Sequence, residues 1–267
     1  MPANLHSPLV RREALGGPYA LLTFRHPQVA TEASPGQFVM IKAGLSSEPP
    51  LRRPFSIMEV DPGEDSFTLF VKAVGPGSSG LAALAAGDPT LCLGPLGRGF
   101  EACPPERQAL FVAGGYGIAP MLFLARRWPE GARRPKVFFG ARTAADIQLA
   151  DRFEGVAELI ITTEDGSLGS TGRVTEPLSK ELDRGEPAAL FGCGPDAMLH
   201  ALARLGARHG VPCQVSLDPW MGCGVGTCLS CVVRIQGEGE QRPHYRCACT
   251  QGPVFDAHQV VWPEAPA

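Results

Sequence analysis

The sequence carries no excess of one charge. Its 24 Lys and Arg residues nearly balance 27 Asp and Glu residues, which gives a formal net charge of -3. Proteins that bind nucleic acid present a basic patch or stripe, and this composition provides neither. We therefore expect no nucleic-acid partner.

Long hydrophobic runs are missing as well. The most apolar stretch, residues 110–125, contains three glycines and a proline. It is also shorter than the roughly 20 apolar residues that cross a bilayer. The first ten residues lack the basic and apolar segments of a secretory signal. These absences predict a cytoplasmic protein without a membrane span.

Neither an internal repeat nor a low-complexity linker divides the 267 residues, so domains are inferred from changes in local composition. A chain of this length, 44% hydrophobic, can form two or three domains. Within residues 1–103, short apolar or alternating runs are separated by glycine and proline. The runs lie at residues 20–24, 38–41 and 67–71. This pattern predicts a small antiparallel β-barrel.

The pattern changes after the Gly- and Pro-containing segments at 94–97 and 104–105. Residues 104–213 alternate apolar strands with helical stretches, which predicts an α/β domain with a parallel sheet. The expected strands are 109–113, 136–139, 159–162 and 188–191, and the expected helices are 119–128 and 195–209. Residues 214–267, rich in glycine and cysteine, form a third, small domain with a hairpin predicted at 231–235. The fold class is thus multidomain.

Five of the nine cysteines fall between residues 223 and 249. Cytosolic reductants keep thiols reduced, so these cysteines are better explained as metal ligands than as disulfides. Cys223, Cys228 and Cys231 have the C-x₄-C-x₂-C spacing of plant-type two-iron ferredoxins. Distance along the chain does not decide whether Cys247 or Cys249 is the fourth ligand. The single cysteines are expected to be structural: Cys92, Cys103, Cys193 and Cys213.

Glycines surround the proposed ligands for a chemical reason. Four thiolates and two sulfides around two ferric ions leave a net negative cluster, which needs backbone N–H donors. Gly222, Gly224 and Gly226 allow the loop to curl with its N–H groups inward. A zinc site is the alternative, but structural zinc prefers two close cysteine pairs. Only the Cys228–Cys231 spacing and the Cys247/Cys249 pair fit this preference. The spacing therefore favours a [2Fe-2S] cluster.

Two segments of the first domain could bind a flavin. Residues 52–57 read Arg-Arg-Pro-Phe-Ser-Ile and could supply a phosphate-binding guanidinium, a fixed turn, a stacking ring and a hydroxyl. Residues 70–72 are followed by Gly75-Pro76-Gly77-Ser78, whose N–H groups could hold a pyrophosphate. Alone, the first segment would be better explained as a surface turn with an exposed arginine.

Two glycine turns in the second domain could bind a nicotinamide dinucleotide. Gly114-Gly115-Tyr116-Gly117 joins a strand to a helix, so a phosphate there would meet a helix N-terminus. Cys193-Gly194-Pro195 forms a second turn at the same edge of a parallel sheet, where doubly wound folds bind ligands. Either turn alone would be explained equally well by ordinary strand-to-helix packing.

Taken in order, these motifs resemble the ferredoxin-reductase-like flavoproteins over nearly the whole chain. Within them the sequence is most similar to the electron-transfer subunits of class 1B dihydroorotate dehydrogenase. Further matching segments are Gly94-Pro95-Leu96-Gly97, residues 163–169 and residues 249–255. The family's last cysteine stands three residues before Gly-Pro-Val-Phe, so the resemblance implies Cys249 as the fourth ligand.

The resemblance also assigns residues to cofactors. The sequence departs from the family at Val71, where the family usually has an aromatic residue, and at Ser78, where it usually has threonine. The resemblance implies no acid-base catalytic residue. The residues implied for FAD are Arg53, Pro54, Phe55, Ser56, Phe70, Val71, Lys72, Gly77 and Ser78. Those implied for NAD are Gly114, Gly115, Gly117, Cys193, Gly194 and Pro195. The implied cluster ligands are Cys223, Cys228, Cys231 and Cys249.

The implied activity is electron transfer between NAD(H), FAD and the [2Fe-2S] cluster. An FMN-containing partner would oxidise dihydroorotate to orotate in pyrimidine biosynthesis, in a heterotetramer of two plus two subunits, and this chain alone would not oxidise dihydroorotate. Glu164 and Asp165, after a predicted strand, would repel a 2′-phosphate and so favour NADH over NADPH.

Three alternatives remain. One is the small subunit of a ferredoxin:NADP⁺ reductase or sulfide dehydrogenase complex, whose members often replace the first cluster cysteine by aspartate, so that Cys223 argues against it. A reductase that feeds a hydroxylase is another. The third, from a different class, is a zinc-stabilised redox-sensing or binding module, which would make the nucleotide motifs coincidental.

Overall fold

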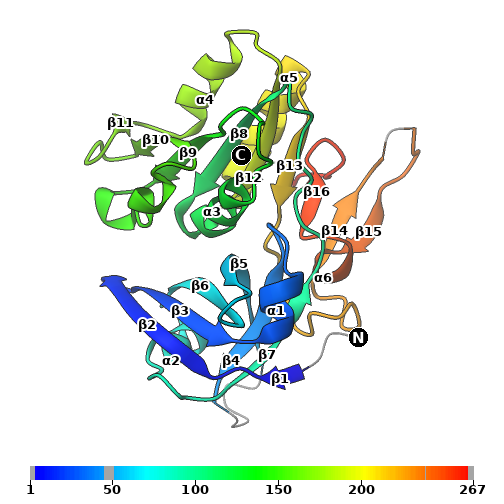
Figure 1. Cartoon of the computed structure of the whole chain (residues 1–267). Helices are drawn as coiled ribbons and strands as arrows, with labels where there is room; N and C mark the ends of the chain where they lie inside the picture. Colours follow the sequence, from blue (N-terminus) through cyan, green and yellow to red (C-terminus); the bar gives the residue numbers. More distant parts are fainter. Residues whose placement is uncertain (1–3, 45–50, 238, 264–267) are drawn as a thin grey trace.

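The computed structural model describes residues 4–44, 51–237 and 239–263. In this part of the chain, two seven-stranded sheets are followed by a two-stranded hairpin, and the last strand of the second sheet comes after the hairpin. Figure 1 shows the first sheet below, the second above it, and the C-terminal segment at the side of both. The multidomain fold expected from the sequence is confirmed.

The first sheet is antiparallel, in the order β1-β7-β4-β5-β6-β3-β2. The consecutive strands β1 and β2 are its two edges, and Leu9 at the start of β2 exchanges backbone hydrogen bonds with Gly87 and Asp88 just before β7, so the sheet closes into the predicted barrel. Helices α1 (Pro27–Glu32) and α2 (Pro76–Ala82) pack on it. Its strands are β1 (Asn4–His6), β2 (Leu9–Gly16), β3 (Tyr19–Arg25), β4 (Phe38–Ala43), β5 (Arg53–Asp61), β6 (Ser66–Lys72) and β7 (Thr90–Leu96).

The second sheet has the order β11-β10-β9-β8-β12-β13-β16, and all its pairs are parallel except the last. Its strands are β8 (Gln108–Gly114), β9 (Lys136–Ala141), β10 (Glu158–Thr163), β11 (Ser170–Thr171), β12 (Ala188–Cys193), β13 (Cys213–Ser216) and β16 (Val254–Asp256). Its helices are α3 (Ile118–Arg126), α4 (Thr175–Leu182) and α5 (Asp196–His209), with short 3₁₀ turns η1 (Gly115–Gly117), η2 (Ala144–Asp146) and η3 (Ala150–Phe153).

Alternate residues of the central strand β8 serve the two faces of this sheet. Phe111 packs in one hydrophobic cluster with α3, whereas Val112 packs in another with α4 and α5. This is the two-residue period of a strand that is buried on both sides. The parallel sheet covered by helices on both faces agrees with the expected α/β architecture.

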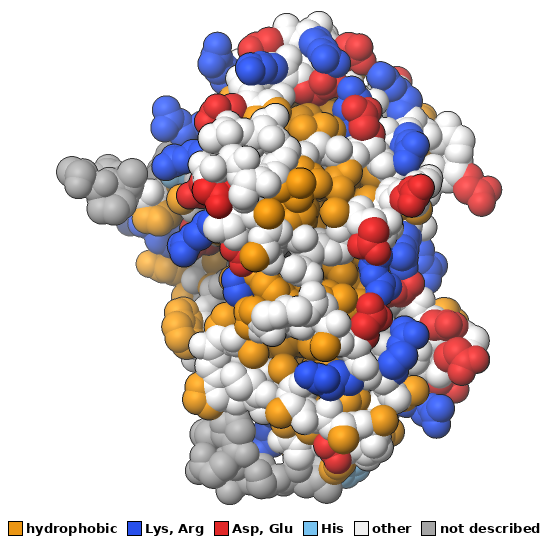
Figure 2. Space-filling model, turned by 90° about the vertical axis from the view of Figure 1, so that its left-hand side faces the viewer, with side chains coloured by type: hydrophobic (Ala, Val, Ile, Leu, Met, Phe, Trp, Pro, Cys, Tyr) orange, Lys and Arg blue, Asp and Glu red, His pale blue; other side chains and the backbone are white. Residues whose placement is uncertain are grey.

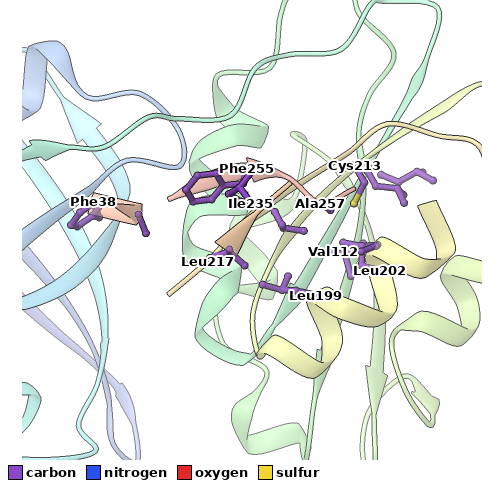
Figure 3. Packing of buried hydrophobic residues seen from close by; sticks show 14 of the residues in the cluster. Phe38, Val112, Leu199, Leu202, Cys213, Leu217, Ile235, Phe255 and Ala257 are labelled. Atoms are coloured by element: carbon purple, nitrogen blue, oxygen red, sulfur yellow. The ribbon is translucent and has the colours of Figure 1, made fainter. Parts of the chain in front are cut away.

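The C-terminal segment is joined to both larger parts. It contains β14 (Val232–Ile235), β15 (His244–Cys247) and α6 (Ala248–Gln251), and its last strand, β16, pairs antiparallel with β13. One hydrophobic cluster contains Phe38 of the barrel together with Leu217 and Phe255. Figure 3 shows these residues with their neighbours. Strand β13 crosses the predicted limit at residue 213, and the three domain ranges stay a prediction.

No helix within the described residues is both long and apolar enough to pass through a membrane.

His26 provides a pH-sensitive cap for α1. Its Nδ1 accepts a hydrogen bond from the Val29 N–H at 3.3 Å, and the ring is 1% exposed. Burial disfavours the charged form and lowers the pKa of His26 below its ordinary value. Because the pKa of His26 is lower in the folded state, the unfolded chain takes up the proton first as the pH falls. The contribution of neutral His26 to the free energy of unfolding is therefore present above the unfolded pKa of about 6.5 and is lost as the pH falls below it.

We expect His26→Asn to remove this pH dependence while it retains a capping oxygen. The free energy of unfolding of the unmodified protein should fall below a pH of about 6.5, by about 1.4 kcal/mol for each unit of pKa depression. Urea unfolding at several pH values measures this slope. His6→Asn, at an exposed position of β1, is the control. Equal slopes for both variants would contradict the assignment.

Candidate functional site

The four predicted cluster ligands come together as two pairs. Cys223, Cys228 and Cys231 lie in the loop between β13 and β14, and Cys249 lies in α6. The thiols of Cys223 and Cys228 contact each other, as do those of Cys231 and Cys249. The first pair lies near the surface and the second is buried.

Backbone N–H groups point at these thiols. Those of Val225 and Cys228 lie 3.4 Å from the Cys223 sulfur, and that of Gly226 lies 3.2 Å from the Cys249 sulfur. Gly224 and Gly226 have φ values of +77° and +79°, which glycine adopts without strain. The loop therefore has the inward N–H groups expected from its glycines.

The thiol pKa values follow from these surroundings. Hydrogen bonds from the side chain and backbone of Ser230 lower the pKa of Cys228 to about 6. Burial opposes ionisation of Cys223, but the N–H groups outweigh it and the pKa is lowered. Burial raises the pKa of Cys249 to about 12. The surroundings of the surface pair thus favour ionisation of its thiols, whereas those of Cys249 oppose it.

In the described part of the chain, no three His, Cys, Asp or Glu side chains converge closely enough to hold one metal ion. Two thiol pairs are the arrangement that a two-iron cluster requires, since each iron takes two cysteine ligands. The donor chemistry and the N–H groups therefore fit a [2Fe-2S] cluster.

Cys247 lies beside the buried pair, and its thiol also contacts Cys231. Its own N–H donates to Gln251 Oε1 at 3.0 Å, and its side chain is half-buried. Cys249, in contrast, receives the Gly226 N–H from the ligand loop. This difference favours Cys249 as the fourth ligand, which stays a prediction.

The predicted flavin residues on β5 and α2 lie against each other. A Cβ added to Gly77 would be 2.9 Å from Arg53 Nε, so the arginine occupies the space that a side chain at Gly77 would take. The Ser78 hydroxyl accepts the N–H groups of Val74 at 2.9 Å and Gly75 at 3.1 Å, which closes the turn at the start of α2. A guanidinium beside a glycine turn fits a pyrophosphate. Pro54, Phe55 and Ser56 follow Arg53 along β5 and are all partly exposed.

The three residues of segment 70–72 lie in different environments. Val71 is 0% exposed within the barrel core, so only its backbone can meet a ligand. The Phe70 ring stacks on Tyr19 with centroids 5.4 Å apart. Lys72 Nζ lies 3.0 Å from Asp146 Oδ1 and 4.9 Å from the centre of the Tyr19 ring.

Asp146 links this segment to the second sheet. The Tyr19 hydroxyl donates to its carboxylate, and this bond together with Lys72 lowers the pKa of Asp146. Tyr19 and Asp146 in turn raise the pKa of Lys72. Tyr19 and Asp146 are 127 positions apart and share no motif, so neither was predicted from the sequence.

The two glycine turns of the second sheet interlock. A Cβ on Gly117 would be 2.2 Å from the Cys193 carbonyl oxygen, and one on Gly114 would be 2.6 Å from Pro195 Cδ. A Cβ on Gly194, whose φ is +155°, would likewise clash with the Gly114 backbone. Because β8 and β12 are neighbours in parallel register, both turns emerge at one edge of the sheet, as expected. Gly115, at φ +54°, has open space at its Cβ position.

Acidic and phenolic groups surround these turns. Burial raises the pKa of Cys193 to about 12, and Asp218 contributes to the shift. Partial burial, followed by Asp218 and Cys193, raises the pKa of Tyr116. Burial and Asp196 raise the pKa of Asp218. Asp218, in the link to the cysteine loop, carried no sequence signal and was missed.

Comparisons with known proteins agree with this geometry. The family model described as the iron-sulfur cluster binding domain of dihydroorotate dehydrogenase B matches residues 218–261, and the oxidoreductase NAD-binding domain matches residues 111–204.

Curated relatives extend the match to nearly the whole chain. The dihydroorotate dehydrogenase B (NAD⁺) electron transfer subunit of Desulforamulus reducens is 39% identical over 90% of this chain and 92% of its own length. The protein of the same name from Geobacillus kaustophilus is 37% identical over 90% and 91%.

A solved structure supports the fold along its full length. A chain in the structure of an NADH-dependent reduced ferredoxin-NADP oxidoreductase has a TM-score of 0.84 and 30% identity, covering 98% of this chain and 92% of that one. A ferredoxin reductase of carbazole 1,9a-dioxygenase, at 24% identity and a TM-score of 0.68, shares the fold. The chain therefore belongs to the family of dihydroorotate dehydrogenase B electron transfer subunits, within the ferredoxin-reductase-like flavoproteins.

Proposed function

We propose that the chain passes electrons between NAD(H), FAD and a [2Fe-2S] cluster for a partner that oxidises dihydroorotate to orotate. One observation carries this proposal. Met40 of the barrel lies in the same hydrophobic cluster as Cys231 and Cys249, so the cysteine loop is built onto the barrel that carries the flavin motif. A cluster held there would lie beside the strand that pairs with the flavin motif, because Gly224 of the loop lies against Met40 and Met40 pairs with Pro54.

Each part of the chain has a role in this scheme. Arg53 and the Gly77 turn would hold the FAD pyrophosphate, the turns at Gly117 and Gly194 would hold NAD, and the four cysteines would hold the cluster. The bound cofactors supply the redox chemistry: flavin takes two electrons as a hydride and exchanges them singly, and the cluster carries one at a time. The chain positions these groups, and no side chain has to act as an acid or base.

Apolar surface supports binding of flat cofactor rings near the junction of the two sheets. Figure 2 shows hydrophobic side chains gathered along the middle of one face, at the level where the barrel meets the parallel sheet. Ligand sites are predominantly apolar with a few placed polar groups. Lys72 and Asp146, which join the barrel to the second sheet, provide such groups.

The partner would dock on the face that carries the surface cysteine pair. Cys228 is exposed, and large exposed hydrophobic side chains lie on the same loop and hairpin. Patches of this kind mark protein interaction sites. We propose an FMN-containing catalytic subunit as the partner, in a complex of two plus two subunits. The exposed set comprises Trp220, Val225, Leu229, Val232 and Tyr245.

In the complex, dihydroorotate and NAD⁺ would give orotate, NADH and a proton. The two electrons would leave the substrate at the partner's FMN and reach NAD⁺ through this chain. Without its partner, the chain would oxidise NADH with an artificial acceptor but would not oxidise dihydroorotate.

A second candidate is the small subunit of a ferredoxin-NADP oxidoreductase, favoured by the 98% overlap with a chain of such an enzyme. The cysteine at the first ligand position, Cys223, argues for the electron transfer subunit of dihydroorotate dehydrogenase. Adding the catalytic subunit and measuring orotate formation with NAD⁺ separates the two, since the second candidate predicts none.

Anaerobic purification followed by iron, sulfide and flavin analysis tests the cofactor content. We expect about two irons and two sulfides per chain, as a two-iron cluster requires, together with FAD. Bound zinc without sulfide would contradict the proposal.

Arg53→Gln should weaken FAD binding without loss of the cluster. Removing a charge-assisted hydrogen bond costs about 1.5–3 kcal/mol, which corresponds to roughly 10- to 100-fold in affinity. Equilibrium dialysis or flavin fluorescence measures this change. Arg11→Gln, at an exposed position of β2, is the control. Unchanged affinity for Arg53→Gln would exclude the arginine from the pyrophosphate site.

A further inference from the structure

The cysteine loop touches the barrel through a residue that has no side chain. Gly224, next to Cys223, is buried and has φ +77°. A Cβ placed there would be 2.6 Å from Met40 Cγ and 3.1 Å from Leu96 Cδ1. The backbone of the loop therefore lies directly on two barrel side chains, and no side chain larger than hydrogen fits between them.

Met40 stands between the loop and the strand that carries the flavin motif. It lies on β4, directly opposite Pro54 of β5, and the next pair in the ladder is Ile41 with Arg53. Met40 is 0% exposed, and Leu96 on β7 is 5% exposed. Moving from Pro54 to Cys223 thus crosses one strand pairing, the Met40 side chain and the Gly224 contact.

We propose that Gly224 is a positioning residue for electron transfer: its contact with Met40 and Leu96 fixes the separation between the flavin site and the cluster. This inference rests on the proposed function. In the step concerned, reduced flavin gives up one electron and one ferric ion of the cluster becomes ferrous. The second electron follows after the cluster has passed the first to its acceptor, and the proton of the oxidised flavin goes to water.

An added methyl group has two possible effects, and both disturb this separation. Either the loop moves away from the barrel, or Met40 turns and the packing beside β5 changes. Dense cores resist such insertions. The rate of electron transfer falls with the separation between donor and acceptor, so we expect Gly224→Ala to slow the flavin-to-cluster step several-fold.

The matched control is Gly239→Ala. Gly239 has φ +79° and open space at its Cβ position, so it shares the backbone strain without a barrel contact. Stopped-flow absorbance after mixing with NADH follows the flavin and the cluster separately. For Gly224→Ala we expect normal flavin reduction and slow cluster reduction, whereas Gly239→Ala should keep both rates. Equal cluster-reduction rates in the two variants would overturn the proposal.

A second measurement needs neither electron transfer nor cofactor turnover. In a double-mutant cycle on unfolding, Gly224→Ala and Met40→Ala should couple strongly, because removal of the Met40 side chain makes room for the methyl group. Gly239→Ala and Met40→Ala should be additive. If Gly224→Ala alone does not fold, recovery of folding in the double variant supports the contact, and failure to recover contradicts it. NADH-dependent flavin reduction and the iron content of the unmodified chain test the proposed function separately.

Discussion

Replacing Cys249 by serine should remove the iron-sulfur cluster, whereas replacing Cys247 should leave it in place. Cys249 is 1% exposed, contacts Cys231 and receives the Gly226 N–H from the ligand loop. Its pKa of about 12 shows how strongly its surroundings oppose a thiolate without a cation. A serine hydroxyl ionises far less readily than a thiol and is a poor ligand for this soft site.

Iron and sulfide analysis together with the visible spectrum measures this effect. We expect Cys249→Ser to fall from about two irons per chain to the background level, and Cys247→Ser to retain the full complement. Flavin content serves as the internal control, because the FAD motif lies on the barrel. A full cluster in Cys249→Ser, lost only when Cys247 is also replaced, would assign the fourth position to Cys247.

Gly117→Ala should impair the reaction with NADH much more than Gly115→Ala. A Cβ at Gly117 would lie 2.2 Å from the Cys193 carbonyl oxygen, so one of the two interlocked turns has to move. Forced backbone shifts of this kind cost roughly 1–3 kcal/mol, which is about 5- to 150-fold if it is lost from nucleotide affinity. At Gly115 the methyl group meets no atom within 4 Å, and only the strain of its φ of +54° remains.

Steady-state oxidation of NADH with an artificial acceptor gives the KM for each variant. The expected result is a KM raised about 5- to 150-fold for Gly117→Ala, with flavin and iron content unchanged. Loss of both cofactors would indicate general unfolding instead. Similar KM values for the two variants would show that the interlocked turns do not shape the nucleotide site.

Features encoded by nearby residues were predictable from the sequence. The C-x₄-C-x₂-C spacing, the glycine turns at Gly114 and Gly194, and the strands β3, β4, β6, β8, β9, β10 and β12 depend on local periodicity and turn chemistry. Helix α2 was harder to predict, because its glycines and serines are typical of a loop. Its Pro76 at the first turn and Ser78 closing that turn were the available signals.

Contacts between distant segments were not predictable. Tyr19 meets Asp146 and Gly224 meets Met40 only because the barrel, the parallel sheet and the cysteine loop share cores. Asp218 follows β13 in an irregular link whose path depends on the same packing. A single sequence carries no periodic signal for pairings of this kind.

The position of β16 has a consequence for the order of assembly during synthesis. This strand completes the edge of the parallel sheet beside β13, yet it follows all four proposed ligands in the chain. On the ribosome, the cysteine loop therefore emerges while that edge of the sheet is still open. Val254–Asp256, which closes that edge, follows α6 and Cys249 almost directly, so the edge of the parallel sheet and the proposed metal centre are held by one short segment of the chain.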